Sequence, residues 1–246
     1  MKHFRTIAML ALCVIMITSS TVFAAEEATY SSYEQPRFED YFGVEPLNAG
    51  WWNDYGTTVG VWRGPGAINV HTHILGSPPG YFPFHYWMMR GQTAWGNAIG
   101  VSINSVTTNT NAHIRAWGGT RPAINLFRGV PLHVGEYGRA VVSLGATLHG
   151  LAYLPGSGVP RVRVAEIISH ARIYVVAGEL SSAQTRVVTV HELGHALGYV
   201  GHSRNRGDVM FHMSENEGGV HTNFNLSSRD QNHLRQIYHN PNFRFR

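Results

Sequence analysis

One stretch constrains the fold more than any other: SSAQTRVVTVHELGHALGYVGHS, residues 181–203. Ser181 is followed three residues later by Gln184, a capping box that predicts the start of a helix. Gly198 suits the left-handed conformation in which many helices end. We therefore expect a helix that runs to about Leu197 and stops at this glycine.

Three histidines of this stretch have the spacing of a metal site. His191 and His195 are four residues apart, so both rings leave the same face of the helix and one cation can meet both. A catalytic zinc usually has three protein ligands and one open position. His202 is the only ligand-type side chain just beyond Gly198. Gly201 lacks a Cβ and can adopt the backbone angles that return the chain to the metal.

Glu192 flanks such a metal without entering its ligand set. Zinc lowers the pKa of a bound water to about 7. A neighbouring carboxylate can take the proton of that water, deliver hydroxide to a peptide carbonyl and later protonate the leaving amine. The motif is therefore one set of reagents on one rigid turn. The alternatives are a chance match on an exposed helix and a site that binds metal without turnover.

The N-terminus has the composition of a secretory signal peptide. Lys2 and Arg5 precede an apolar run over residues 7–18, and a small-residue end at Ala24 follows. The run is shorter than the roughly 20 residues that span a bilayer. We expect cleavage after residue 24 or 25, a secreted, extracellular protein, and no stable membrane insertion.

Charge divides the rest of the chain. Residues 25–60 hold seven acidic residues against one arginine, whereas residues 61–246 hold sixteen arginines against eight acidic residues. We interpret residues 1–24 as the signal peptide, 25–60 as an acidic leader or pro-segment, and 61–246 as the catalytic domain. A carboxylate such as Glu39 or Asp40 could cover the metal in a precursor; an untethered acidic tail is the plainer alternative.

The basic body limits the partners. Its arginines are scattered, which argues against nucleic acid and leaves an anionic extracellular polymer as a candidate partner. The only cysteine, Cys13, lies in the signal peptide. Any zinc must therefore be held by His, Asp or Glu. We expect a monomer.

Hydrophobic patterns predict a mixed sheet with packed helices. Strands are expected at residues 67–75, 100–106, 112–117 and 161–176, the last as one or two strands, and helices at 85–99 and from Ser227, with Asp230 three residues on. The Gly- and Pro-rich stretch 118–145 receives no element. Strands interleaved with helices indicate an α/β or α+β fold.

HELGHALGYVGHS resembles the elongated zinc signature of the metzincin metallopeptidases and, among them, is most similar to the matrixins. That family's spacing places the third histidine where this chain has Gly201, so one residue is inserted and His202 takes the role. Met210, eight residues beyond His202, resembles the Met-turn that floors the zinc site. GLAYLPG, residues 150–156, resembles a strand and loop of the matrixin cleft, and LSSRDQNHLRQIY the closing helix. The likeness covers about residues 60–240.

The resemblance implies a metzincin-like twisted mixed sheet with an antiparallel edge strand, an active-site helix and a C-terminal helix. It implies a zinc-dependent endopeptidase that acts on a protein or peptide substrate with one catalytic zinc. The implied metal ligands are His191, His195 and His202, the general base is Glu192, and the residues that support the site are Gly198, Gly201 and Met210.

Several family features differ. Without a mature cysteine there can be no cysteine switch. His212 stands where some relatives have an extra tyrosine ligand, and its role stays open. Loops for calcium or a second zinc are not recognisable; His149 and His170 lie in the region of a second zinc but are better interpreted as ordinary histidines. Two alternative functions remain: a catalytically weak secreted binding or adhesion module on this fold, and a cell-wall peptide amidase.

Overall fold

The computed structural model describes residues 59–62, 66–78, 82–128, 131–153, 160–199, 202–203, 205–211 and 220–238. In residues 146–153 and 160–167 it describes the backbone alone. The predicted signal peptide, the leader up to residue 58, Gly201 and His212 lie outside these ranges. The first described strand begins at Val59, two residues before the predicted start of the catalytic domain, and that boundary stays a prediction.

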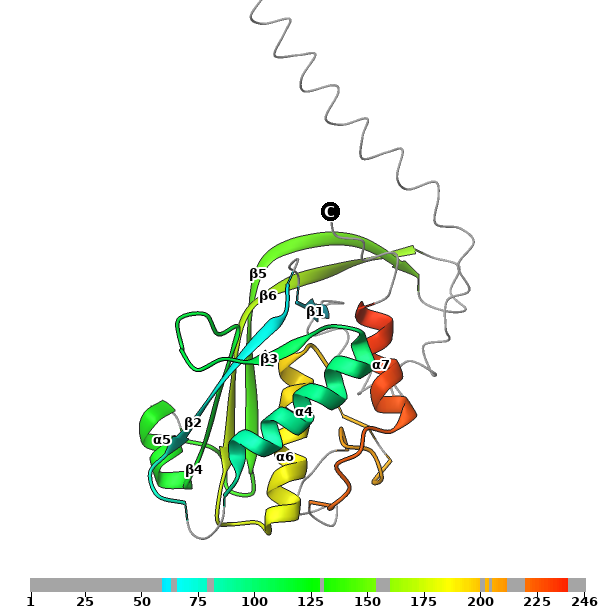
Figure 1. Cartoon of the computed structure of the whole chain (residues 1–246). Coiled ribbons are helices and arrows are strands. Elements are labelled where there is room, and N and C mark those ends of the chain that lie inside the picture. Colours follow the sequence, from blue (N-terminus) through cyan, green and yellow to red (C-terminus); the bar gives the residue numbers. More distant parts are fainter. Residues whose placement is uncertain are drawn as a thin grey trace, which may run out of the picture. The chain divides into compact units, whose positions relative to one another are not determined.

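Six strands form one twisted sheet (Figure 1). They are β1 (Val59–Val61), β2 (Ile68–Leu75), β3 (Ile103–Ser105), β4 (Ile114–Gly119), β5 (Gly138–Tyr153) and β6 (Pro160–Val176). Their order is β1-β6-β4-β2-β3, and β5 also pairs with β6. All these pairings are parallel except that of β5, which runs antiparallel to β6. The predicted mixed sheet with an antiparallel edge strand is confirmed.

Four helices accompany the described sheet: α4 (Phe84–Ile99), α5 (Arg121–Arg128), α6 (Ser182–Ala196) and α7 (Ser228–Tyr238). Helices α4 and α6 pack against each other and against the sheet, and α7 packs beside α4 (Figure 1). None of the helices in the described part combines the length and hydrophobicity that crossing a bilayer requires. The predicted helices at 85–99 and after Ser227 are confirmed.

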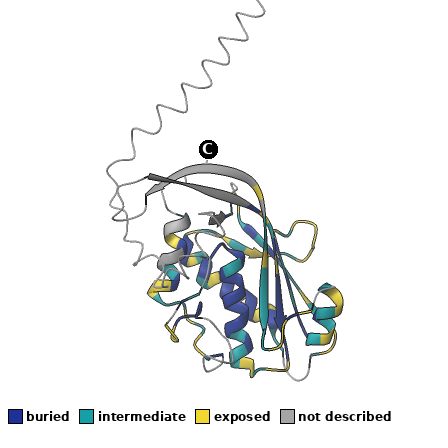
Figure 2. Cartoon of the chain, turned by 180° about the vertical axis from the view of Figure 1, so that it is seen from behind, coloured by how far each residue is buried: buried dark blue, intermediate teal, exposed yellow. Residues whose placement is uncertain are grey.

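The main core lies between helices α4 and α6 and the sheet. Figure 2 shows buried residues in these helices and in the strands beside them. Gly91 of α4 allows close packing, because a Cβ there would lie 3.3 Å from Leu193 and 3.4 Å from Val190 of α6. Trp95, also on α4 and fully buried, donates its indole N–H to the Val190 carbonyl oxygen at 2.9 Å. These contacts fix α6 against α4.

Both ends of α6 form as the sequence predicts. At the start, Ser181 Oγ accepts a hydrogen bond from the Gln184 N–H at 3.3 Å, and Gln184 Oε1 accepts one from the Ser181 N–H at 3.1 Å. At the end, the Tyr199 N–H donates to the Gly194 oxygen and the Gly198 N–H to the His195 oxygen. This is a Schellman motif. Gly198 has φ 102°, the region that favours glycine.

The sequence missed one helix and the start of a strand in residues 118–145. Helix α5 has eight residues, of which only Ile124 is buried, and it is shorter than the window of about 11–18 residues in which a helical period is recognised. Ile124 packs with Leu132, Tyr174 and Val176 in a small second core. The stretch 161–176 lies in a single 17-residue strand, β6, which has a bulge in its pairing with β5.

Candidate metal centre

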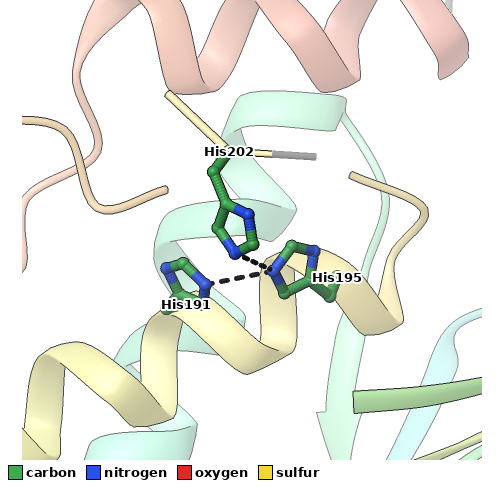
Figure 3. Close-up of side chains that lie close together, drawn as sticks. All are labelled: His191, His195 and His202. Carbon is green, nitrogen blue, oxygen red and sulfur yellow. Dashed lines mark hydrogen bonds between the residues drawn. The ribbon is translucent and has the colours of Figure 1, made fainter. Parts of the chain in front are cut away.

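The three histidines that the sequence singles out come together. His191 and His195 leave the same face of α6, and His202 returns to them from beyond the helix end (Figure 3). His195 Nε2 lies 3.0 Å from His191 Nε2 and 3.2 Å from His202 Nε2. The residue inserted after Gly198 therefore does not separate His202 from the other two rings. Gly201, which we expected to absorb the insertion, lies outside the described residues.

Backbone carbonyl groups fix the orientation of the two helical rings. His191 Nδ1 lies 2.8 Å from the Val209 oxygen, and His195 Nδ1 lies 2.8 Å from the Tyr199 oxygen. A carbonyl oxygen only accepts, so each Nδ1 carries the proton and donates it. Burial lowers the pKa of His195, and the bond to Tyr199 only partly offsets this. In a neutral ring the Nε2 atom then presents a lone pair toward the centre.

This donor set fits a zinc ion. Two Nε2 lone pairs that face each other at 3.0 Å repel unless a cation lies between them. Tetrahedral zinc with Zn–N bonds of about 2.0–2.1 Å separates its nitrogens by about 3.3 Å. The separations of 3.0 and 3.2 Å are close to that value. Histidines that bind a metal ordinarily donate their other ring N–H to a backbone carbonyl group in this way.

Glu192 is buried between α6 and the start of β5. Burial is the main cause that raises its pKa to about 8, and the charge of Glu136 adds to it. The Ala140 backbone N–H, which hydrogen-bonds the carboxylate, and the charge of Arg139 act in the opposite direction. A carboxyl group with such a pKa exchanges protons near neutrality, as a general base requires.

The strand beside Glu192 is β5, but not at the end that the sequence indicated. Residues 150–153 of GLAYLPG form the far end of β5, and residues 154–159 lie outside the described part. Gly138 and Ala140, at the start of the strand, contact Glu192 instead. Nothing in the local sequence around Gly138 signals this position, because the contact depends on how β5 pairs with β6.

Met210 packs against α6 at Gly194. A Cβ on Gly194, the residue before His195, would lie 2.6 Å from Met210 Sδ and 2.8 Å from Trp95 Cζ2. Gly194 therefore leaves the space that the methionine fills. The neighbouring Val209 supplies the carbonyl oxygen that orients His191. The turn that contains Val209 and Met210, here called the Met210 turn, therefore both supports α6 and holds the His191 ring.

Asp230 of α7 holds the Met210 turn through backbone N–H groups. Its carboxylate accepts hydrogen bonds from the backbone N–H groups of Val209 at 3.0 Å, Met210 at 3.2 Å and Ser227 at 2.9 Å. Burial raises its pKa, and these N–H bonds oppose the shift. The sequence predicts Asp230 only as a residue near the start of the helix; its contact with the turn is tertiary and has no local signal.

Asp208 holds the residue that follows His202. The Ser203 hydroxyl donates to Asp208, and the Ser203 N–H donates to the Met210 oxygen at 2.6 Å. Arg229 binds both carboxylate oxygens of Asp208, each at 2.8 Å. Burial alone would raise the pKa of Asp208, but the bonds from Arg229 and Ser203 outweigh it and lower the pKa.

Two aromatic residues fix the corner where α6 ends. Trp62, just after β1, donates its indole N–H to the Ala196 oxygen at 2.8 Å. Tyr238 of α7 donates its hydroxyl to the Leu197 oxygen at 2.8 Å. Both oxygens belong to the last turn of a helix, whose carbonyl groups have no partner within the helix. The chain thus leaves α6 toward His202 from a fixed point.

The three histidines are the one cluster of at least three metal-ligand side chains among the described residues. His170 lies on β6, with Nδ1 3.2 Å from the Ser169 hydroxyl, and the side chain of His149 is not described. A second zinc or a calcium therefore gains no support from this part of the chain.

Comparison with known proteins agrees with this geometry. The profile of the matrixin family matches residues 144–239, while no curated protein matches the chain. The matched range contains the three histidines, Glu192 and Met210. Matrixins use zinc, so the match supports a zinc metallopeptidase in general. Over residues 144–239 the chain is therefore similar to the matrixins, in agreement with the resemblance of its histidine motif.

Proposed function

We propose that the chain is a secreted zinc-dependent endopeptidase in which Glu192 is the general base. One observation carries the proposal: the Nε2 atoms of His191 and His202 lie 3.0 and 3.2 Å from His195 Nε2, and a buried carboxyl group follows the first of these histidines in the chain. The metal would be held by His191, His195 and His202. Bound zinc supplies Lewis-acid chemistry, which polarises a carbonyl and makes water more acidic.

Glu192 then carries out both proton transfers. Glu192 accepts a proton from water as the water oxygen adds to the carbonyl carbon of the peptide bond. The carbon–nitrogen bond breaks, and Glu192 gives the same proton to the leaving amine nitrogen. One water molecule is thereby added across the peptide bond. The raised pKa of Glu192 supports both steps, because the group must accept and then release a proton.

The edge strand β5 supports an extended protein or peptide substrate. Among the described strands β5 pairs only with β6, so its other edge is available to a peptide except at the Ala140 N–H, whose hydrogen bond Glu192 accepts. Extended peptides bind such edges through main-chain hydrogen bonds. The start of β5 lies against Glu192, so a peptide aligned there would present a peptide bond to the general base. Secretion is proposed from the N-terminal sequence alone.

The test is the Glu192→Gln variant, with Glu179→Gln as the matched control. Glu179 is a partly exposed glutamate that pairs with Arg121, away from the three histidines. We expect Glu192→Gln to bind zinc with wild-type stoichiometry and to lose about 10²–10⁴-fold in casein cleavage. Glu179→Gln and the wild type should stay active until a chelator removes the metal.

Two results would contradict the proposal: full activity in Glu192→Gln, or wild-type cleavage that a chelator does not affect. Incubation with purified cell wall in parallel separates peptide-bond cleavage in proteins from action on cell-wall peptides. A protein that binds zinc and cleaves neither would be the binding module instead.

A further inference from the structure

Gly138, the first residue of β5, packs so closely against α6 that there is no space for a side chain. A Cβ on this residue would lie 2.6 Å from Glu192 Oε1, 2.7 Å from Glu192 Cγ and 2.6 Å from Val188 Cγ1. Real Cβ atoms essentially never approach other atoms below 3.0 Å. Val188 and Glu192 are one helical turn apart, so the strand backbone lies across both of them.

The need for glycine at this position is spatial. Gly138 is not among the glycines with positive φ, which include Gly135 and Gly198. Alanine could therefore adopt the same backbone angles without strain. The Cβ of an alanine, however, would overlap with the Glu192 carboxyl group.

Ala140, two residues further along β5, binds the same carboxyl group. Gly138 and Ala140 are two residues apart in a strand, so their side-chain positions lie on the same face and their N–H groups point to the same edge. The Ala140 backbone N–H hydrogen-bonds the Glu192 carboxylate. One residue thus leaves space for Glu192 and the next but one holds it.

We propose that Gly138 is a positioning residue for Glu192: by lacking a side chain it lets the edge strand hold the carboxyl group of the general base against the Ala140 N–H. The inference rests on the proposed function for its catalytic consequence. Its structural consequence, the contact between Ala140 and Glu192, can be measured without any activity.

The first experiment is hydrogen exchange in the metal-free full chain. In Gly138→Ala the carboxyl group must leave the Ala140 N–H, so this amide should exchange at least about tenfold faster, as it should in Glu192→Ala. The amide of Ile173, in the neighbouring strand β6, serves as the internal reference. Unchanged exchange at Ala140 in Gly138→Ala would overturn the proposal, whether or not the wild type is a peptidase.

The second experiment measures peptide cleavage. A displacement of about 1 Å at a reacting group can cost about 10²-fold in rate, so Gly138→Ala should lower kcat by about that factor. Zinc content and KM should change by less than about twofold, because the substitution leaves the histidines and the part of β5 beyond Ala140 unchanged. Gly66→Ala is the matched control, since a Cβ there meets nothing within 4 Å.

Val188 separates displacement of Glu192 from simple crowding. If Gly138→Ala acts by pushing β5 away through Val188, then adding Val188→Ala restores activity, and the proposal is wrong. If it acts on Glu192, the double variant stays impaired. In a Glu192→Asp background, whose shorter side chain withdraws from the new Cβ, Gly138→Ala should cost far less than in the wild type. Equal costs in the two backgrounds would also overturn the proposal.

Discussion

Helix α6 and residues 203 and 205–211 each hold part of the proposed metal site, but by opposite means. The helix sets the spacing of His191 and His195 by its own geometry, and its N-terminal capping bonds lie within the helix. The histidine just before Ser203 is positioned by contacts outside any helix: Ser203 binds Asp208 and Met210, and Asp208 in turn binds Arg229, 21 residues further along the chain. Two ligands are thus local in origin, and the third is a product of the tertiary fold.

This difference teaches where the site is vulnerable. A helix that is buried, capped and packed against α4 retains two ligands even when a distant contact is lost. The third ligand depends on a chain of contacts that passes through the Met210 turn to α7. We expect loss of these distant contacts to weaken metal binding more than loss of contacts within α6.

The largest effect is expected from Asp230→Ala. The change leaves the buried N–H groups of Val209 and Met210 and the partly buried N–H of Ser227 without an acceptor, and each buried group left so costs about 1–3 kcal/mol. We expect the free energy of unfolding to fall by about 3 kcal/mol or more in urea denaturation. The control is Thr189→Val, which removes a buried hydroxyl bonded to Thr185 within α6 and should cost less than about 1 kcal/mol. Equal costs would break the comparison.

A pair of serines sharpens the comparison further. Ser203→Ala removes the bond to Asp208 beside the third ligand, and loss of such outer contacts weakens metal binding about 10–100-fold. Ser181→Ala removes the cap of α6, which costs about 1 kcal/mol of stability and should leave zinc affinity within about twofold. Competition with a chromogenic chelator measures both affinities. Weaker zinc binding in Ser181→Ala than in Ser203→Ala would reverse our account.

The smallest effect concerns pH. Glu136 raises the pKa of Glu192, and Arg139 lowers it. A general base is active when deprotonated, so kcat/KM rises with pH through that pKa. Glu136→Gln should therefore move the acidic limb to lower pH, and Arg139→Gln should move it to higher pH, each by less than about one unit. Shifts in the same direction for both variants would show that neither charge acts through Glu192.

The sequence predicts the parts of the site that are local. The capping box, the four-residue histidine spacing and the glycine at the helix end all lie within one stretch, so α6 and its ends follow directly. The missed features join distant residues: Trp62 to Ala196, Asp230 to Met210, and Gly138 to Glu192. Helix α5 was missed for a different reason, because its eight residues are too short a segment for a helical period to be recognised.

The most direct test of the central claim is X-ray absorption at the zinc edge, on the zinc-loaded wild type and on His202→Ala. The account predicts three imidazole nitrogens at about 2.0–2.1 Å in the wild type and two in His202→Ala, with zinc bound more weakly. The same number of imidazole ligands in both proteins would show that His202 does not bind the metal, and would contradict the account.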